Sequence, residues 1–292
     1  MPTAIATASY RGDFERCRLL CESMDARMEG HTRHLILVEA ADVAMFRQLA
    51  GPKREIVDER DLLPAWLRPF PDPTNFGRRR IWLSPFGWPL RGWHVQQLRR
   101  IALAASLDED VMVSIDSDVV FLKDFDASVF TPAGKTLFFR RPDAILDVTP
   151  EHRDEHLDWS KKAGEFLGIK APATTDTGYV ATLIPWRTKA VKAMVERIEA
   201  VSGRSWLATL AGSRILSECT IYGRFVDEVE GRIGDYVPTS ESFCRMYWSG
   251  APMDEESLAR FVEDLEPGQV AAGIQSFTAT DPGLIRRAAG LR

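Results

Sequence analysis

Two aspartates follow an apolar run near the middle of the chain. Residues 111–118 read Val-Met-Val-Ser-Ile-Asp-Ser-Asp, so Asp116 and Asp118 stand two positions apart at the end of a predicted strand. Side chains two apart on a strand lie on the same face, so both carboxylates can contact one ligand. Two buried carboxylates this close repel each other, and a divalent cation removes the repulsion. The pair therefore predicts a metal ion that holds a phosphorylated ligand.

A purely structural explanation of these aspartates also exists. An Asp after a strand often caps the next helix or forms a turn. Here the chain continues with Val119-Val120-Phe121-Leu122, which is apolar again. A strand that ended in solvent would be followed by polar residues, whereas here the two charges interrupt an apolar segment. We therefore prefer the interpretation that the aspartates bind a ligand.

Composition and charge exclude several classes of protein. A chain of 292 residues with 45% hydrophobic content can bury the core of one large α/β domain or two modest ones. The net charge of −5 argues against nucleic acid as a partner, because such binding needs a basic surface. The first residues lack the pattern of a signal peptide, and no apolar run approaches the roughly 20 residues of a membrane span. We therefore expect a cytoplasmic protein with at most peripheral membrane association.

The first third of the chain alternates between strand and helix patterns. Short apolar runs alternate with segments whose apolar residues recur at helical spacing. This order predicts a Rossmann-like half of a sheet, with ligands gathered at the edge where its parallel strands end. The chain has no Gly-x-Gly-x-x-Gly sequence, so a dinucleotide fingerprint is absent. The expected elements are strands over 4–9, 34–38 and 55–57 and helices over 14–28 and 41–49.

Residues 62–94 interrupt this alternation. Six of the 17 prolines and four of the eight tryptophans fall between residues 64 and 93, together with three arginines at 78–80. We expect a long irregular segment, which is typical of binding loops. Trp82, Trp88 and Trp93 could stack on a sugar while the arginines meet phosphate. Equally, the tryptophans could pin the segment to the domain while the arginines stay solvated.

Further candidate residues lie on either side of the aspartates. Arg100 stands on the polar side of a helix predicted over 93–106, where it could contact a phosphate or be solvated. Asp176 and Gly178 precede an apolar strand predicted over 180–184. A glycine there lets the backbone approach a ligand closely, although both residues are also common turn formers.

A carboxylate and a phenol lie one helical turn apart in the last third of the chain. Glu218 and Tyr222 share one side of a predicted helix that also carries Cys219, Ile221 and Phe225. A half-buried Glu is suited to act as a base or to hold sugar hydroxyls. Other predicted elements are strands over 136–140, 243–248 and 269–275 and helices over 155–167, 188–201 and 255–265.

These motifs together resemble a known family. The segment Val-Ser-Ile-Asp-Ser-Asp-Val-Val-Phe-Leu is similar to the Asp-x-Asp segment of glycosyltransferases with the GT-A fold. Gln-Gln-Leu-Arg-Arg, Asp-Thr-Gly-Tyr and Ser-Glu-Cys-Thr-Ile-Tyr-Gly resemble segments of uncharacterised bacterial glycosyltransferase-like proteins of glycan assembly. The resemblance spans about residues 4–275. It implies an α/β, GT-A-like fold with a Rossmann-like mixed sheet flanked by helices.

The resemblance also implies that residues 1–292 form one domain with two binding regions. Residues 1–125 would form the nucleotide-binding half, and residues 126–292 the half that binds sugar and acceptor. The donor would be a UDP- or GDP-sugar, and the acceptor a glycan or a lipid-linked glycan.

The resemblance implies roles for particular residues. Mn²⁺ or Mg²⁺ would bridge the diphosphate of the donor, since hard cations bind carboxylate and phosphate oxygens. Asp118 would be the direct metal ligand, and Asp116 would contact the metal or the ribose. The other residues expected to contact the nucleotide sugar are Thr7, Ser9, Asp13, Arg100, Gly178 and Tyr222.

The sequence departs from this family at the third metal ligand. Many GT-A enzymes supply a His from the C-terminal region, but here no His follows His156. Gln275, Ser276 or a carboxylate would have to substitute, or the metal would be held weakly.

Two mechanisms and two other functions stay open at this stage. An inverting enzyme needs a carboxylate that deprotonates the acceptor, for which Glu218 and Asp176 are the candidates. A retaining enzyme needs no strong base. The alternatives are a haloacid-dehalogenase-type phosphatase with Asp116 as its nucleophile, and a nucleotide-sugar-binding subunit without catalysis.

Overall fold

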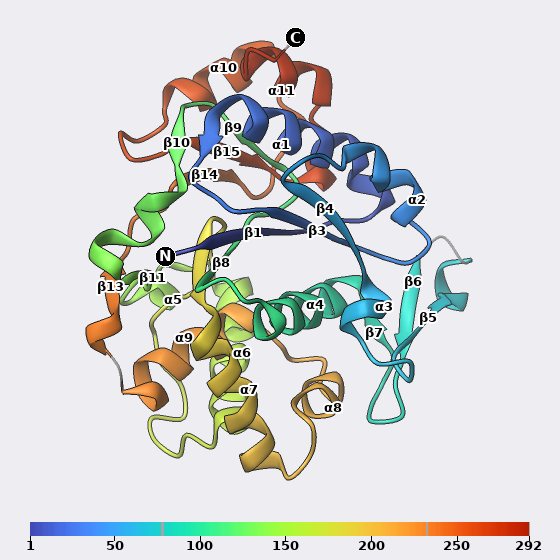
Figure 1. The fold of residues 1–292 in the computed structure, drawn as a ribbon, viewed down its shortest axis with the longest axis vertical. Helices are drawn as coiled ribbons and strands as arrows, with labels where there is room; N and C mark the ends of the chain where they lie inside the picture. The colour runs from blue at the N-terminus through green and yellow to red at the C-terminus, as the bar shows by residue number, and fades with distance from the viewer. Residues whose placement is uncertain (77–78, 232, 292) are drawn as a thin grey trace.

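A five-stranded sheet forms the centre of the protein (Figure 1). The computed structural model describes residues 1–76, 79–231 and 233–291. In order across the sheet, the strands are β12 (Ile184–Arg187), β8 (Val111–Ser114), β1 (Thr3–Ala8), β3 (His34–Val38) and β4 (Arg54–Asp58). The last four are parallel to one another, and β12 is antiparallel to β8 at the edge. The carboxyl ends of β1, β3 and β8 therefore meet at one edge of the sheet.

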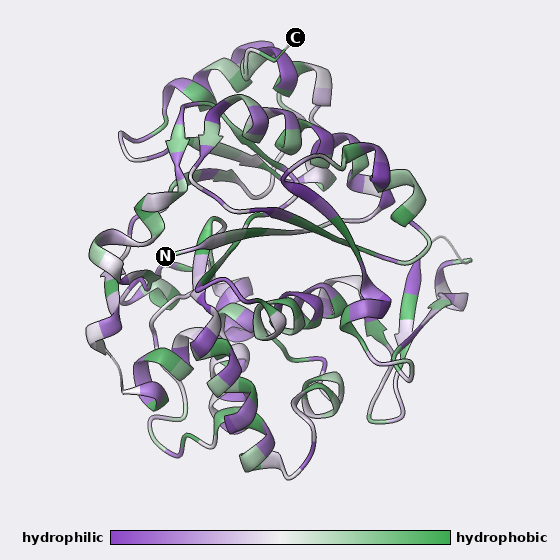
Figure 2. Ribbon diagram, in the orientation of Figure 1, coloured by the Kyte–Doolittle hydropathy of each residue, from purple (hydrophilic) through white to green (hydrophobic). Residues whose placement is uncertain are grey.

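Helices cover both faces of this sheet. α1 (Phe14–Arg27) packs on one face, and α4 (Gly92–Ser106) and α7 (Thr188–Ser202) pack on the other. Successive side chains of β1 serve both cores, with Ile5 on the side of α1 and Ala6 on the side of α4. Figure 2 shows hydrophobic and hydrophilic residues alternating along α4 and α7, as expected for helices with one buried side.

A second, smaller sheet receives the chain after β8. Its strands are β14 (Cys244–Tyr247), β15 (Ala271–Ile274) and β9 (Val119–Phe121), with β9 antiparallel to β15. Val120 packs there with residues of α10 (Glu255–Glu263) and α11 (Pro282–Ala288). The β8–β9 connection, residues 115–118, therefore lies where the two sheets meet.

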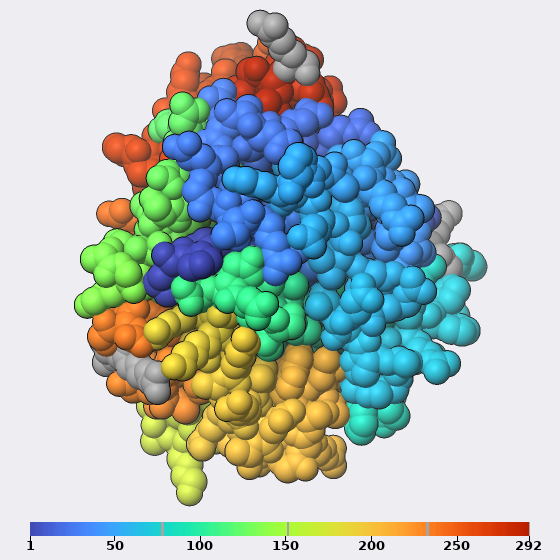
Figure 3. All heavy atoms as spheres, in the orientation of Figure 1, coloured from blue at the N-terminus to red at the C-terminus, as the bar shows by residue number. Residues whose placement is uncertain are grey.

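The two predicted halves of the chain pack against each other. The largest core cluster contains Ala6 and Leu98 from residues 1–125 and Trp186 and Val191 from residues 126–292. Figure 3 shows the same continuity on the surface, where the green segment around residue 100 lies directly against gold segments around residue 200. The boundary near residue 125 therefore does not separate two cores.

The predicted mixed α/β class is confirmed, and so is the alternating start of the chain. β3 has the bounds predicted for it, and α1 begins at the predicted residue. The helix expected over 41–49 is shorter, because α2 (Val43–Phe46) passes into a 3-10 turn, Arg47–Leu49. The strand–helix–strand–helix–strand order holds despite this change.

The prediction of a long irregular segment over 62–94 is wrong. The segment contains an antiparallel sheet of β5 (Arg68–Pro71), β6 (Arg80–Leu83) and β7 (Leu90–Arg91). Two of its six prolines, Pro69 and Pro71, lie in β5, which is an edge strand, where a missing N–H on the open side costs no hydrogen bond to a neighbour. Trp82 is buried against the central core, which fits the interpretation that this tryptophan pins the segment to the domain.

The strand predicted over 180–184 is also misplaced. The chain becomes extended only from Ile184 and continues as β12 through Pro185. Proline is tolerated because β12 lies at the edge of the sheet.

The remaining elements complete the two halves. Among the described residues, no helix is both long enough and apolar enough to cross a membrane. The helices not yet named are α3 (Glu59–Leu62), α5 (Ala144–Asp147), α6 (Pro150–Leu167), α8 (Trp206–Ala211) and α9 (Glu218–Phe225), and the strands are β2 (Met28–Glu29), β10 (Phe125–Asp126), β11 (Thr136–Phe139) and β13 (Tyr236–Thr239).

Candidate functional site

The β8–β9 connection holds Asp116 and Asp118 at the edge of the central sheet. The backbone N–H of Asp116 donates to the Thr182 hydroxyl at 3.1 Å, and the carbonyl of Asp118 accepts from Ile274 N–H at 3.1 Å. The carbonyl of Asp116 accepts from Val119 N–H at 3.2 Å. These bonds tie the connection to the second sheet and to the segment before β12, so the positions of the two carboxylates are set by the fold rather than by a mobile turn.

Asp118 is the residue whose surroundings are least favourable for a charge. Its Oδ1 is buried and has no hydrogen-bond partner among the described residues. Burial, and then the nearby charges of Asp116 and Asp13, raise the pKa of Asp118 to about 7, against the opposing effect of Arg16. A buried oxygen of this kind fits a cation or a hydrogen-bond donor supplied by a ligand.

Asp13 and Arg16 lie opposite Asp118, at the start of α1. The Arg16 guanidinium donates to the carbonyls of Ile274 at 2.9 Å and Thr280 at 2.8 Å. Burial raises the pKa of Asp13, while a hydrogen bond with Ser276 and the charge of Arg16 act in the other direction. Arg16 was not among the predicted site residues; the available signal was a charged residue between Phe14 and Cys17 in a helix that packs into the core.

Asp116 belongs to a different network, built on the other face of the sheet. The buried Arg100 guanidinium contacts Asp116 and donates to Glu218 Oε1 at 2.9 Å. Burial alone would lower the pKa of Arg100, but the charges of Asp116 and Glu218 outweigh burial and raise it. Gln97 Oε1 accepts from the backbone N–H of Glu218 at 2.9 Å, which fixes the start of α9. Arg100 is therefore neither solvated nor free to reach phosphate while it bridges these carboxylates.

The residues around Asp118 fit a divalent cation in part. The Oδ1 atoms of Asp118 and Asp13 are both buried without a hydrogen-bond partner, and hard cations bind such oxygens. Asp116, by contrast, is already paired with Arg100. In the described ranges, no group of three or more His, Cys, Asp or Glu residues is placed to hold a metal. Bound phosphate oxygens and Ser276, beside Asp13, would have to complete the ligand set.

Thr7 and Ser9 lie at the end of β1, and both are buried; the Ser9 hydroxyl has no hydrogen-bond partner among the described residues. Arg54 donates to His34 Nδ1 at 3.0 Å, so the ring hydrogen is on Nε2, which bonds the Thr7 hydroxyl at 3.0 Å. Burial lowers the pKa of His34 well below its usual value, which keeps the ring neutral. Ser9 is buried beside Cys17. Asp13, rather than these two hydroxyls, is the residue of this group that faces the aspartates.

Asp176 and Gly178 lie on a connection away from these contacts. Asp176 is exposed, and its carbonyl accepts from Ile145 N–H at 3.1 Å. Gly178 forms a two-way backbone bridge with Arg141, and a Cβ at Gly178 would lie 2.7 Å from the Cβ of Ala144. The glycine therefore allows two backbone segments to pack closely.

Tyr222 is a core residue. Its ring is stacked 5.2 Å from the Trp186 ring, and its hydroxyl accepts the backbone N–H of Arg187 at 2.9 Å. Tyr222 therefore packs α9 against β12.

A Tyr222→Phe variant should separate this packing role from ligand binding. The variant leaves the Arg187 N–H without its partner, so the free energy of unfolding should fall by about 1–3 kcal/mol. Binding of UDP or GDP should be unchanged. Chemical denaturation and nucleotide-dependent melting shifts measure the two effects; a lost nucleotide shift in a folded variant would place Tyr222 in the site after all.

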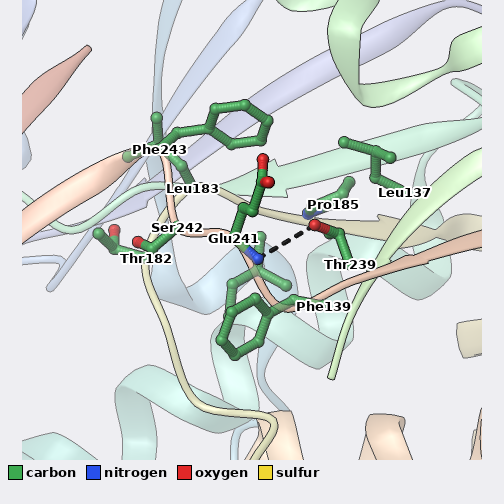
Figure 4. A pocket seen from close by; sticks show the side chains of 10 residues that line it. Leu137, Phe139, Thr182, Leu183, Pro185, Thr239, Glu241, Ser242 and Phe243 are labelled. Atoms are coloured by element: carbon green, nitrogen blue, oxygen red, sulfur yellow. Dashed lines mark hydrogen bonds between the residues drawn. The ribbon is translucent and has the colours of Figure 1, made fainter. Parts of the chain in front are cut away.

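Figure 4 shows a small cavity lined in part by Thr182, whose hydroxyl accepts the Asp116 N–H. Thr182, Leu183 and Glu241 are among its lining residues, and the Glu241 N–H donates to the Thr239 hydroxyl at 3.1 Å. Its volume of about 10 Å³ admits roughly one water molecule. This cavity is therefore too small for a nucleotide sugar.

The fold and the site together define an α/β protein with paired carboxylates at the edge of a parallel sheet. Residues 1–288 match a family described as "Family of unknown function (DUF6492)". The match covers nearly the whole chain, and the chain belongs to this family. No curated protein matches the sequence.

Proposed function

We propose that the protein is a GT-A-like glycosyltransferase that moves a sugar from a UDP- or GDP-sugar to a hydroxyl of a glycan or lipid-linked acceptor. The observation that carries the proposal is the unpaired, buried Oδ1 of Asp118. It lies at the connection where the chain passes from one sheet to the other, with Asp116 and Asp13 nearby. The buried, unpartnered oxygens of Asp118 and Asp13 at the ligand-binding edge of such a sheet are suited to a cation that carries a diphosphate.

The side chains have separate tasks in this proposal. Asp118 and Asp13 would hold Mn²⁺ or Mg²⁺, which when bound neutralises the charge of the leaving nucleoside diphosphate. Arg16 stabilises these carboxylates from α1, and Arg100 holds Asp116 and Glu218 in place. The sugar and diphosphate would lie over the β8–β9 connection. The reaction would take place in the cytoplasm.

Glu218 is better placed than Asp176 to act near the transferred sugar. Glu218 is buried and joined to Asp116 through Arg100, whereas Asp176 is exposed. Glu218 accepts a hydrogen bond from Arg100. As a base, Glu218 would therefore take the proton of the acceptor's hydroxyl while it stays beside the Arg100 guanidinium. The contact fixes the position of the Glu218 carboxylate.

The same contact favours a second candidate, a nucleotide-sugar-binding protein without transferase activity. A Glu218 fully satisfied by Arg100 would then be structural. Hydrolysis of a donor sugar without acceptor, detected as release of UDP or GDP, would speak against this candidate. No observation specifically favours a phosphatase, whose nucleophile would be Asp116, the carboxylate that Arg100 holds.

A melting panel tests the proposal. UDP and GDP, each with Mn²⁺, should raise the melting temperature of the wild-type protein by several degrees, because a ligand that binds only the folded state stabilises it. The shift should require Mn²⁺ or Mg²⁺ and vanish in Asp118→Asn. Equal shifts with and without a cation, or none with any nucleoside diphosphate, would contradict the proposal.

A further inference from the structure

A second cleft opens at the start of α4, outside the carboxylate site. It has a volume of about 600 Å³, within the usual range of small-molecule sites. Four segments meet there: β7, the first turn of α4, the first half of α6 and the connection before α9. Its lining residues are Arg91, Trp93, His94, Glu155, Asp158, Trp159, Arg214 and Ile215. It is called the Trp93–Trp159 cleft below.

Two tryptophans line the cleft. The rings of Trp93 and Trp159 lie 5.8 Å apart at an angle of 34°, and the His156 ring packs 4.7 Å from that of Trp159. Trp93 lies in the first turn of α4, a helix that packs into the core, yet 47% of its surface is exposed. A large aromatic face left open in a concave site is suited to the C–H faces of a pyranose ring.

The lining of the cleft contains as many positively charged as negatively charged side chains. Arg91 and Arg214 line the cleft together with Glu155 and Asp158. Burial, outweighing the hydrogen bond to the Arg214 carbonyl, lowers the pKa of His94, so the imidazole adds no charge near pH 7. Guanidinium groups donate to hydroxyls and carboxylates accept from them. A charge-balanced lining of this kind suits a neutral polyhydroxyl compound better than a phosphate.

The cleft is rigidly connected to the carboxylate site. His94 Nε2 donates to the Arg214 carbonyl at 2.8 Å, and one turn further along α4 Gln97 holds the start of α9 at Glu218. Arg100 follows His94 by six residues, or about 9 Å of helix. A sugar in the cleft would therefore lie along the same α4–α9 contact that positions Glu218.

From these observations we propose that the Trp93–Trp159 cleft binds a neutral sugar ring of a glycan, stacked on the tryptophans and hydrogen-bonded by the surrounding charged groups. That this glycan is the acceptor rests on the proposed function; that the cleft binds a sugar does not.

Binding of the purified protein to a glycan array of neutral and anionic oligosaccharides tests the proposal. The wild-type protein should bind neutral glycans. Trp93→Ala should weaken this binding about tenfold or more, which corresponds to about 1.4 kcal/mol. Asp158→Ala, which removes an exposed carboxylate of the lining, should weaken it severalfold without affecting the fold. Trp248→Ala is the matched control, since Trp248 is 52% exposed and lies after β14, outside the lining.

Melting shifts with UDP or GDP and Mn²⁺, measured on the same variants, separate this inference from the proposed function. Trp93→Ala should keep the nucleotide shift of the wild-type protein. Nucleotide binding without glycan binding would overturn the cleft assignment alone, and glycan binding without nucleotide binding would overturn the proposed function alone. Binding restricted to anionic glycans, or retained in both Trp93→Ala and Asp158→Ala, would also overturn the cleft assignment.

Discussion

At pH 8 and in the presence of a chelator, Asp118→Asn is expected to melt at a higher temperature than the wild-type protein; with Mn²⁺ present, the variant is expected to lose nucleotide-sugar turnover. The pKa of Asp118 is raised from an ordinary value of 3.8 to about 7 in the folded protein. Above pH 7 the folded protein must therefore carry a poorly solvated charge. An amide has nearly the same shape and no charge, so the substitution removes the cost.

The pH dependence of stability follows from the same shift. Between about pH 4 and pH 7, Asp118 is ionised in the unfolded chain but protonated in the folded protein, so the contribution of Asp118 to stability falls as pH rises through this window. The loss should amount to a few kcal/mol, which is on the order of 5 °C in melting temperature. Asp118→Asn should lack this part of the pH dependence.

Activity should change in the opposite direction. Without the Asp118 carboxylate, turnover of a donor sugar should fall about 100-fold or more, because several kcal/mol of charge stabilisation are lost with the cation. Mn²⁺ should raise the melting temperature of the wild-type protein more at pH 8 than at pH 6, and should not raise that of the variant. Asp108→Asn, at an exposed position, is the control. A lower melting temperature for Asp118→Asn at pH 8 would show that the Asp118 charge is compensated inside the folded chain.

The sequence revealed the fold best where local signals agree with tertiary context. Residues 35–38, Leu-Ile-Leu-Val, form an apolar run after His34, and all five residues are buried, so the predicted and observed strands coincide. The six prolines of residues 62–94, Pro69 and Pro71 among them, favoured an irregular segment, and the strand predicted over 180–184 ended before Pro185, which lies inside β12. Pro69, Pro71 and Pro185 lie in edge strands, and edge position is a property of the assembled sheet that a local pattern does not contain.

Most residues of the candidate site could be predicted from the sequence, but the contacts between them could not. Asp116 and Asp118 stand out because charge interrupts an apolar run, and both lie at the predicted edge of the sheet. Arg100 and Glu218 were each singled out, yet their direct contact joins residues 118 positions apart. Arg16 went unnoticed because its partners Ile274 and Thr280 are more than 250 residues away. Only packing of α1 against the second sheet brings them together.

Arg100→Met is expected to cost about 3–5 kcal/mol of stability, the usual effect of removing one partner of a buried ion pair. The guanidinium is the group that compensates both Asp116 and Glu218, and both Arg100 and Glu218 are buried. Methionine fills much of the same volume but leaves two uncompensated carboxylates close together. Chemical denaturation should show the loss.

Two further variants separate charge compensation from function. Arg99→Met removes another buried arginine of α4, which is paired with Glu59, so it should destabilise the protein similarly while preserving nucleotide-dependent melting shifts. Combining Arg100→Met with Asp116→Asn and Glu218→Gln should restore most of the lost stability, because no charge is left unpaired. The combined variant should remain inactive, since it lacks the carboxylate proposed to accept the proton. Recovery of turnover together with stability would show that Glu218 serves only to hold Arg100, and would favour a retaining reaction without a strong base.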